Sequence, residues 1–487
     1  MNSNLTKLTA FGILWTGISR LSTQLFRFII IVILARLLTP EDFGIVGLAA
    51  IFLGFITTIN ELGLSAAIVQ RKEIDELHLS TSFWASVIAG MTLFIIVVLA
   101  SPFVADFFHE DIVQPILIVS AIGLIIGSFI VVHHALLEKS LTFKKLAIAE
   151  VCAAFVSGMV SISFAINGYG VWSLVFGGLA GGFVSVVILW KIVAWRPSLR
   201  FSFARFKELF GFGSHVMGSR VLNYIDSNMD YLVVGKLLGT SALGYYSFAY
   251  HLIMFPLTRI STMVTRVTFP AFSTIQDDND TLRKGYLKVV RYISLITFPM
   301  LAGMFVVAPD FVVVVYGAKW APMILPLQIL CLAGAISSVG HTVGTILLSK
   351  GRADIQFKWN IFTAIVLPIA VIIGANYGIA GVAAAITVMT VSLFPIIQMI
   401  TNKLIDLSMY SYFKAICPAI IGSITLIIFV EAYQRMSLTI YDLSAIGMLV
   451  SSAIIGIIVY ILLLRIAFND LFKELRSLIH KIRGETK

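Results

Sequence analysis

The sequence predicts an all-α, polytopic membrane protein with fourteen transmembrane helices, arranged as two pseudo-symmetric six-helix bundles plus two extra C-terminal helices. Three observations predict this fold class. The 487 residues are 59% hydrophobic and only 12% charged, whereas soluble domains carry about 25% charged residues. Apolar stretches long enough to cross a bilayer recur along the whole chain. Finally, a pattern found in the first half of the sequence returns in the second half.

The first apolar stretch, residues 11–38, is long enough to span a membrane yet contains arginines. Arg20, Gln24 and Arg27 lie at positions i, i+4 and i+7, so they share one helix face. An arginine near the centre of a spanning helix costs about 2.5–3.5 kcal/mol on insertion scales. We therefore expect this face to line an aqueous cavity. The stretch lacks the pattern of a cleavable signal and is expected to remain as a helix.

The remaining spans follow from apolar runs bounded by short polar joins. In the first half the spans are 11–38, 43–69, 80–104, 113–137, 147–167 and 170–193. In the second half they are 210–238, 242–269, 286–308, 321–348, 358–376 and 378–401, and two more follow at 412–433 and 441–466. The joins at 39–42 and 167–170 are predicted tight turns.

The second half repeats the first. Ser19–Arg20 matches Ser219–Arg220, Gly44 matches Gly244, and the sequence LLEK ending at Lys139 resembles LLSK ending at Lys350. Each copy holds six spans, an even number, so both copies have the same orientation, as in parallel bundles related by an axis along the membrane normal. The predicted domains are bundles at 1–194 and 210–402, a cytoplasmic linker helix at 195–209, helices 13 and 14 within 403–467, and an amphipathic tail at 468–487.

The distribution of basic residues between loops predicts the orientation. If the N-terminus is cytoplasmic, about twenty-three Lys and Arg residues fall on the cytoplasmic side and only Lys319 and Arg435 on the other. Both termini are therefore predicted to be cytoplasmic. The net charge of +10 reflects this topology and does not indicate nucleic-acid binding.

Two basic segments are predicted to lie on the cytoplasmic membrane surface. In 195–212, Phe203, Phe206 and Phe210 follow a helical spacing with Arg205 and Lys207 between them, and the tail at 468–487 has a similar pattern. Both are typical of amphipathic helices that anchor to a membrane surface. A role in gating or in partner binding is the alternative.

Polar and ionisable residues within predicted spans are candidate functional residues. Span seven is the most polar, with a broad stripe that also includes Ser227. The predicted substrate-binding residues are Arg20, Gln24, Arg27, Arg220, Asn223, Tyr224, Arg259 and Arg266, and the ion-coupling candidates are Glu61, Asp226 and Asp230. The alternative for the three acids is that they neutralise arginines and hold the helices together.

An excess of arginine over acids predicts a positively charged cavity open to the cytoplasm. Such a cavity favours an anion, because the planar guanidinium group matches phosphate oxygens. The membrane potential, negative inside, favours outward movement of an anion by about 2.3 kcal/mol per charge per 100 mV. Acids in the same cavity could bind H+ or Na+ and couple the cycle; the sequence does not distinguish these ions.

Several other classes of site are not predicted. Cys152, Cys331 and Cys417 fall in separate apolar spans, and the histidines have no metal-ligand spacing, so neither a disulfide framework nor a metal site nor another cofactor is expected. The sequence contains no phosphate-binding loop, nucleophile elbow or metalloprotease helix. The external loops are too short for a catalytic domain. The protein is therefore predicted not to be an enzyme.

The stretch ILARLLTPEDFG, from Ile33 to Gly44, resembles the polysaccharide-flippase branch of the multidrug/oligosaccharidyl-lipid/polysaccharide (MOP) exporter superfamily. The chain is similar to Wzx- and WzxC-like flippases over nearly its whole length. This resemblance implies a V-shaped pair of bundles in the bacterial inner membrane, with spans one, two, seven and eight lining a cationic cavity.

The same resemblance implies a substrate and a mechanism. The cargo would be an undecaprenyl-diphosphate-linked oligosaccharide, moved from the cytoplasmic to the periplasmic leaflet by alternating access for exopolysaccharide, lipopolysaccharide or O-antigen synthesis. Its lipid tail would lie in a groove near the last two helices. Arg20, Arg27, Arg220 and Arg259 would meet its diphosphate or acidic sugars. It also implies a monomer in contact with membrane lipids, working beside a polysaccharide polymerase and chain-length machinery.

Three alternative functions are compatible with parts of this pattern. A peptidoglycan-precursor (lipid II) flippase is the closest one, because it shares the mechanism. A multidrug antiporter shares the superfamily fold, but a cavity richer in arginine than in acids suits organic cations poorly. A membrane glycosyltransferase or polymerase would need a sizeable external loop with catalytic groups, which the sequence lacks.

Overall fold

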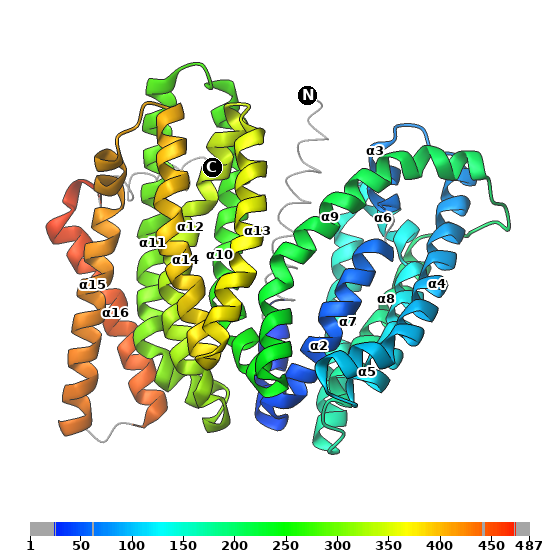
Figure 1. Ribbon diagram of the computed structural model, residues 1–487, viewed down its shortest axis with the longest axis horizontal. Helices are drawn as coiled ribbons and strands as arrows, with labels where there is room; N and C mark the ends of the chain where they lie inside the picture. The colour runs from blue at the N-terminus through cyan, green and yellow to red at the C-terminus, as the bar shows by residue number, and fades with distance from the viewer. Residues whose placement is uncertain (1–23, 25, 61–62, 441–443, 472, 474–487) are drawn as a thin grey trace. The chain divides into compact units, whose positions relative to one another are not determined.

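The computed structural model describes residues 24, 26–60, 63–440, 444–471 and 473 (Figure 1). Every regular element within these residues is a helix, so the prediction of an all-α fold is confirmed. By its internal contacts the chain divides into two compact units, Met1–Gly244 and Tyr245–Lys487. We call them unit 1 and unit 2 and describe each by itself.

The described residues contain ten helices long and apolar enough to cross a membrane, or eleven if the bent pair Val113–Ser128 and Val131–Lys139 forms one span. These helices match eleven of the fourteen predicted spans in position, and they identify a multi-pass membrane protein. Predicted spans seven and eight are helical as α9 (Phe203–Leu238) and α10 (Thr240–Thr274), but among the described helices they do not reach the apolarity of a typical span. The first predicted span lies largely outside the described residues.

Unit 1 consists of helices, and two of its predicted spans are interrupted by short breaks, between α2 and α3 and between α5 and α6. Its elements are α2 (Pro40–Asn60), α3 (Leu64–Gln70), α4 (Glu76–Phe108), α5 (Val113–Ser128), α6 (Val131–Lys139), α7 (Phe143–Ile166), α8 (Trp172–Ile192) and α9. The close α7–α8 contact depends on Gly177 and Gly181, where an added Cβ would collide with Ser161 and Ser157. Small residues at such crossings let helix backbones approach closely in a membrane.

Helix α9 packs against α2, α3 and α4 of unit 1. In sequence it is the first span of the second copy, yet its contacts place it with the helices of the first copy. In Figure 1 it begins near the start of α4, crosses the end of unit 1 that carries α3 and α6, and then descends beside α2. The domain division predicted from the duplication stays a prediction.

The start of α2 meets the start of α10 at two glycines that the sequence repeat pairs with each other. A Cβ at Gly44 would overlap the carbonyl oxygen of Thr240, and a Cβ at Gly244 would overlap the carbonyl oxygen of Pro40. All four residues belong to unit 1. The contact is reciprocal. Gly44 contacts Thr240, Gly244 contacts Pro40, and the sequence repeat pairs position 40 with position 240. This is the pattern expected when two equivalent segments meet across a two-fold axis.

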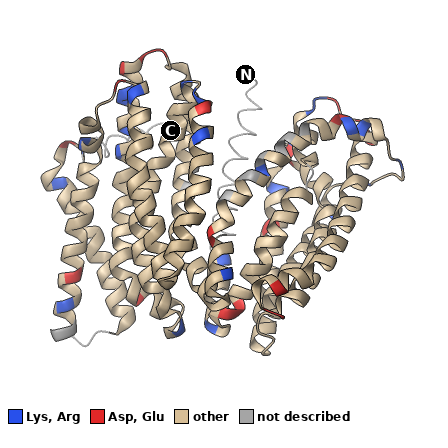
Figure 2. Ribbon diagram, viewed as in Figure 1, with Lys and Arg blue, Asp and Glu red and all other residues tan. Residues whose placement is uncertain are grey.

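Unit 2 contains the rest of α10 and the helices that follow it. These are α11 (Asn279–Val315), the short 3₁₀ helix η1 (Ala318–Met323), α12 (Ile324–Ser349), α13 (Ala353–Ala375), α14 (Gly378–Leu404), α15 (Met409–Ile440) and α16 (Ala445–Ala467). Helix α11 packs against α12, α15 and α16. Its core includes Tyr286, Val290 and Ile293. In each unit most charged residues lie near the helix ends (Figure 2), as expected for helices that cross hydrocarbon.

The predicted linker helix at 195–209 requires a correction. Helix α8 ends at Ile192 and α9 begins at Phe203, and residues 193–202 between them are not helical. We call this segment the strap. Long-range hydrogen bonds to α4 replace helical ones: Ser198 N donates to Ser80 Oγ at 3.0 Å, and Ser202 N donates to Thr81 Oγ1 at 3.1 Å. Phe206, expected on the lipid-facing side, instead packs against the bundle near Leu209. The predicted tail lies mostly outside the described residues.

Candidate substrate-binding site

A cavity of about 420 Å³ lies between α2 and α9 within unit 1. Pockets for small ligands typically have volumes of about 300–1,000 Å³. The spacing of its α9 residues places them on one helix face. The lining residues are Thr57 and Thr58 of α2, and Arg220, Asn223, Tyr224, Ser227 and Asn228 of α9.

Tyr224 fastens the two helices together at this cavity. Its hydroxyl donates to the carbonyl oxygens of Ala50 at 3.2 Å and Ile51 at 2.9 Å, both on α2. Gly54 provides the space, because a Cβ there would overlap the Tyr224 hydroxyl. The Tyr224 ring also lies against Phe55, with centroids 6.3 Å apart. Tyr224 is therefore a wall of the cavity that also sets the separation of its two helices.

A second close contact fixes α9 further along, at the break between α2 and α3. Gly63 has a φ of +65°, a left-handed conformation that favours glycine. A Cβ there would also overlap the backbone of Gly213 on α9. Beyond this point Leu209 is buried with Leu64 and Ala67 of α3. The cavity is thus bounded by helices whose backbones are held at two levels.

The cavity combines one cation with several neutral hydrogen-bonding groups. The hydroxyls of Thr57 and Thr58 donate to the carbonyls of their own helix, at 2.6 Å and 2.9 Å, so their oxygens are oriented to accept hydrogen bonds from a ligand. The Asn228 amide donates to the Tyr224 carbonyl at 2.8 Å. Among the seven lining residues, Arg220 carries the charge. This set suits a ligand with many hydroxyl groups and a negative charge.

Three residues predicted from the sequence, Arg220, Asn223 and Tyr224, line this cavity together. Their role in substrate binding stays a prediction. Gln24 is half-buried and Arg27 is exposed on the helix before α2, and neither is among the lining residues. Arg266 is exposed on the part of α10 that belongs to unit 2.

The remaining predicted residues are described only in part. Arg20 and Glu61 lie outside the described residues. The helix backbone is described at Asp226 and Arg259, but their side chains are not. Asp230 is buried on α9, with 4% of its surface exposed. The proposed coupling role of the three acids therefore stays a prediction.

Three lining residues, Thr57, Thr58 and Asn228, are not among those predicted from the sequence, and Ser227 is predicted only as part of the stripe on span seven. A signal was available on span two, where Thr57, Thr58 and Asn60 interrupt an otherwise apolar run. Span two lacks an arginine beside these polar residues, whereas the neutral residues predicted on spans one and seven lie beside Arg20 and Arg220. Which neutral groups face the cavity depends on α9, which no local pattern in α2 reveals.

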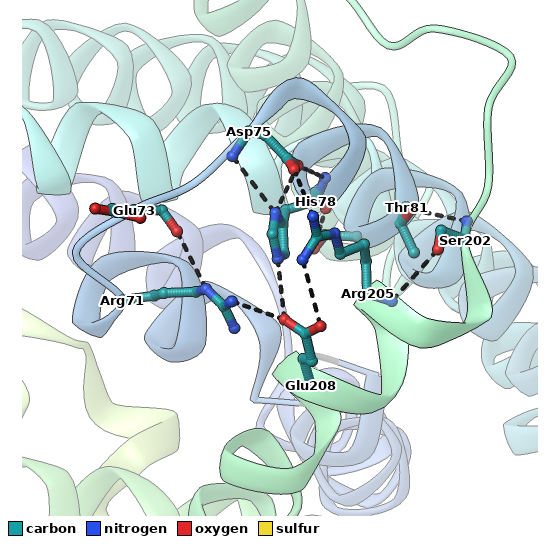
Figure 3. Close-up of polar contacts among 9 residues, drawn as sticks. Arg71, Glu73, Asp75, His78, Thr81, Ser202, Arg205 and Glu208 are labelled. Carbon is teal, nitrogen blue, oxygen red and sulfur yellow. Dashed lines mark hydrogen bonds and ion pairs between the residues drawn. The ribbon is translucent and has the colours of Figure 1, made fainter.

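A second polar cluster ties the beginning of α9 to the turn between α3 and α4 (Figure 3). His78 is at its centre, with a side chain only 3% exposed. Its Nδ1 lies 2.5 Å from Asp75 Oδ1 and its Nε2 lies 3.4 Å from Glu208 Oε2. Arg71 Nη2 lies 2.7 Å from Glu208 Oε2. Arg205 lies between the two acids: its Nη2 is 3.2 Å from Asp75 Oδ2 and its Nη1 is 3.3 Å from Glu208 Oε1. We call these five residues the His78 cluster.

The His78 cluster keeps both of its carboxyl groups ionised. The backbone N–H of His78 donates to Asp75, and this hydrogen bond holds the pKa of Asp75 below its ordinary value of 3.8. The hydrogen bond from the His78 ring, together with Arg71, holds the pKa of Glu208 below 4.5. Each acid already has basic partners, so we interpret the cluster as a clamp on α9.

Comparison with known proteins adds to this geometry. The family model described as "Polysaccharide biosynthesis protein" matches residues 33–325. The chain is 31% identical over 435 residues to the lipopolysaccharide biosynthesis protein WzxC of Escherichia coli, covering 86% of this chain and 83% of that protein. It is 28% identical to the teichuronic acid biosynthesis protein TuaB of Bacillus subtilis (85% and 86% covered) and to the succinoglycan biosynthesis transport protein ExoT of Rhizobium meliloti (75% and 74%).

Solved structures resemble the chain in fold. The lipid II flippase MurJ in an inward closed conformation matches with a TM-score of 0.74 and 17% identity, covering 94% of this chain and 100% of that one. An inward-facing multidrug resistance MATE family transporter of the MOP superfamily matches with a TM-score of 0.60 and 18% identity, covering 78% and 95%. At these identities the likeness concerns the fold alone.

Proposed function

Because this chain belongs to the polysaccharide biosynthesis protein family, we propose that it is a flippase for lipid-linked oligosaccharides. It moves undecaprenyl-diphosphate-linked repeat units from the cytoplasmic to the periplasmic leaflet of the bacterial inner membrane, for exopolysaccharide or O-antigen synthesis. The names of its relatives, which refer to lipopolysaccharide, teichuronic acid and succinoglycan, support this class of cargo. The protein acts as a transporter and not as an enzyme.

The α2–α9 cavity is the observation that carries this proposal. A lipid-linked oligosaccharide presents a negatively charged diphosphate next to sugar hydroxyl groups. Arg220 supplies a guanidinium group for phosphate or acidic-sugar oxygens, and the neutral Thr, Ser and Asn groups supply partners for hydroxyls. This lining supports a cargo that carries phosphate or acidic-sugar oxygens and many hydroxyl groups.

The proposed topology has fourteen spans, two six-helix bundles and two extra helices, with both termini in the cytoplasm. The lower apolarity of α9 and α10 is then explained because each presents one side to water inside the protein. Alternating access moves the head group, and protons or sodium ions bound at Glu61, Asp226 or Asp230 drive the cycle. The protein works as a monomer, beside the polysaccharide polymerase and chain-length machinery.

Export by cells that lack their own flippase tests the proposal. Arg220→Gln should reduce polysaccharide export at least about tenfold, the loss of one strong charge-assisted interaction, and Arg220→Lys should retain an intermediate level. The alanine variants Arg20→Ala, Arg220→Ala and Arg259→Ala should abolish export while leaving membrane insertion intact. The control is Arg435→Gln, a change at an exposed arginine of α15. All variants are compared at equal abundance in the membrane. Normal export by Arg220→Gln and by Arg220→Gln/Asn223→Ala would contradict the assignment of the site.

A lipid II flippase is the second candidate, because the fold of MurJ matches most of the chain. Complementation separates the two candidates. Rescue of a strain depleted of its lipid II flippase, without rescue of a strain lacking an exopolysaccharide flippase, would replace the proposed cargo by the peptidoglycan precursor.

A further inference from the structure

The strap and the first turn of α9 present a row of large apolar side chains to the surroundings of unit 1. Leu199 is 91% exposed, Phe201 50% and Phe203 72%. Arg200 and Lys207 are exposed beside them. We propose that this edge docks into the headgroup layer of the cytoplasmic leaflet and binds acidic phospholipids. The proposal rests on the proposed topology but not on the identity of the cargo.

Hydrogen bonds to α4 explain why the row points away from the protein. Ser198 bonds to Ser80 through both its N and its Oγ, each at 3.0 Å, and Ser202 N bonds to Thr81. Ser80 and Thr81 are fully buried. These bonds hold the strap backbone against α4 at Ser198 and at Ser202. The side chains of Leu199 and Phe201 between these two points, and that of Phe203 just after them, remain exposed.

The surface below the strap indicates that lipid, and not a soluble protein, covers the row. Trp84 of α4 donates its ring N–H to the Ser198 carbonyl at 2.9 Å. One turn further along α4, Ile88 is 58% exposed, and Met91 follows it. These residues lie within a helix that is apolar enough to cross the membrane. The apolar row is thus continuous with a side of α4 that faces hydrocarbon, at the depth where tryptophan is typical of the interface.

The local charge favours acidic headgroups. Residues 193–208 contain four Lys and Arg residues and one acid, Glu208. That acid and Asp75 are already engaged by Arg71, Arg205 and His78 within the His78 cluster (Figure 3). Arg196 donates to the carbonyls at the end of α8. Arg200 and Lys207 are the exposed cations of this stretch that remain beside the apolar row. Basic and apolar groups in this combination are typical of segments that bind anionic membrane surfaces.

Docking at this edge would act on the cavity through α9. The helix runs without a break from Phe203 to Leu238. At about 1.5 Å per residue, Arg220 lies roughly 25 Å along the helix axis from Phe203. The His78 cluster prevents the first turns from separating from α3 and α4. Lipid bound at the strap therefore sets the depth of the helix that carries most of the cavity lining.

Spin labels can measure the depth of the row directly. Single cysteines are placed at Leu199, Phe201 or Phe203 in a chain whose three native cysteines are replaced, and a nitroxide is attached. The proteins are reconstituted in phosphatidylcholine alone or in an equimolar mixture with phosphatidylglycerol. Collision with oxygen reports lipid, and collision with a water-soluble nickel chelate reports solvent. The matched control is a label at Asp277, an exposed loop residue in unit 2.

We expect the ratio of oxygen to nickel collisions at all three positions to exceed the control severalfold, and to rise further with phosphatidylglycerol. Arg200→Gln/Lys207→Gln should remove the rise while leaving the labels in lipid. If the three labels collide with nickel as often as the control, the row faces water and is available to a protein partner, which overturns the proposal. A rise that persists in the double variant overturns the role of acidic lipid. These readouts need no transport, so an error in the proposed cargo leaves them unchanged.

Discussion

Unit 1 and unit 2 both contain Tyr, Thr and Asn side chains among apolar helices, but they use them differently. In unit 2 these groups bond to one another: the Tyr286 hydroxyl donates to Gln398 at 3.2 Å and accepts from Thr342 at 3.4 Å. Gln398 in turn donates to Asn402 at 2.7 Å, and all four are buried. In unit 1 the same residue types line a cavity. A polar residue in a spanning helix is a candidate functional residue when its side chain faces a cavity. It is a structural residue when other side chains supply its hydrogen-bond partners.

In another respect the units agree. Lys139, at the end of α6 in unit 1, donates to the carbonyls of Ile68 and Arg71, where α3 ends. Lys350, after α12 in unit 2, donates to the Gln276 carbonyl at 2.6 Å, just beyond the end of α10. The sequence repeat pairs these two lysines. Both place a positive charge at a helix C-terminus, where it is favourable. The two units therefore share these helix-end contacts and differ in their interior.

The largest effect is expected at the glycine that makes room for the cavity wall. Gly54→Leu should force Tyr224 from its hydrogen bonds to α2 and fill the space beside it, and overpacking of this kind costs about 1–3 kcal/mol. We expect export below about a tenth of wild type, since the cavity geometry is lost. The control is Gly303→Leu on α11 of unit 2, where an added Cβ meets no other residue within 4 Å. Equal export by the two variants would mean that the α2–α9 separation is unimportant.

The comparison between the two interiors predicts opposite phenotypes. Gln398→Leu removes the acceptor of the Tyr286 hydroxyl proton and the donor to the Asn402 amide oxygen, at a cost of about 1–2 kcal/mol. The melting temperature of the Gln398→Leu variant in detergent should fall by a few degrees, while its export activity stays normal. Asn223→Ala in unit 1 should leave the melting temperature unchanged and reduce export. If Gln398→Leu reduced export at normal stability, the distinction between satisfied and cavity-facing groups would be wrong.

The paired lysines should give two equal, smaller effects. Lys139→Met and Lys350→Met each remove a cation from helix-end carbonyls. The free energy of unfolding should fall by about 0.3–1 kcal/mol, and by somewhat more where the site is partly buried. The melting temperatures of the two single variants should fall by similar amounts. A neutral change at one lysine and a marked loss at the other would show that the matched positions have diverged in role.

The smallest effect concerns the clamp on α9. Asp75 and Glu208 have lowered pKa values in the folded protein, so they stabilise it above their ordinary values of 3.8 and 4.5. This contribution is lost as the pH falls through the lower folded values. The protection factors of amides at the first turn of α9, which are corrected for the pH dependence of intrinsic exchange, should therefore fall below about pH 4. In unit 2, the N-cap Asp278, whose pKa is lowered mainly by Thr281, provides the reference.

Asp75→Asn separates the clamp from ordinary fraying of a helix end. In this variant, amides at the start of α9 should exchange faster than in the wild type already at neutral pH. The loss of their protection in acid should be smaller than in the wild type. Exchange at the start of α11 should be unchanged. If the acid dependence of α9 survives in Asp75→Asn/Glu208→Gln, other groups control it.

Periodicity and apolar length were sufficient to locate most helices, because a spanning helix must satisfy its backbone internally and needs a minimum apolar length. The polar stripe of α9 likewise identified Arg220, Asn223 and Tyr224 from spacing alone. Thr57 and Thr58 were missed because their exposure to the cavity depends on where α9 packs. Over the strap the predicted helix is wrong before Phe203, because the helical spacing of the aromatic residues begins only there. There the backbone partners are Ser80 and Thr81 of α4, more than a hundred residues away.

The crossing at Gly44 and Gly244 bears on the origin of the chain. Position 44 meets position 240 and position 244 meets position 40, which is how a self-complementary surface behaves when two identical molecules associate. Two separate polypeptides that each carried one such half would pair through this surface in the same way. Once joined, neither half could acquire a bulky residue there without disturbing the other, so the two glycines constrain each other's evolution.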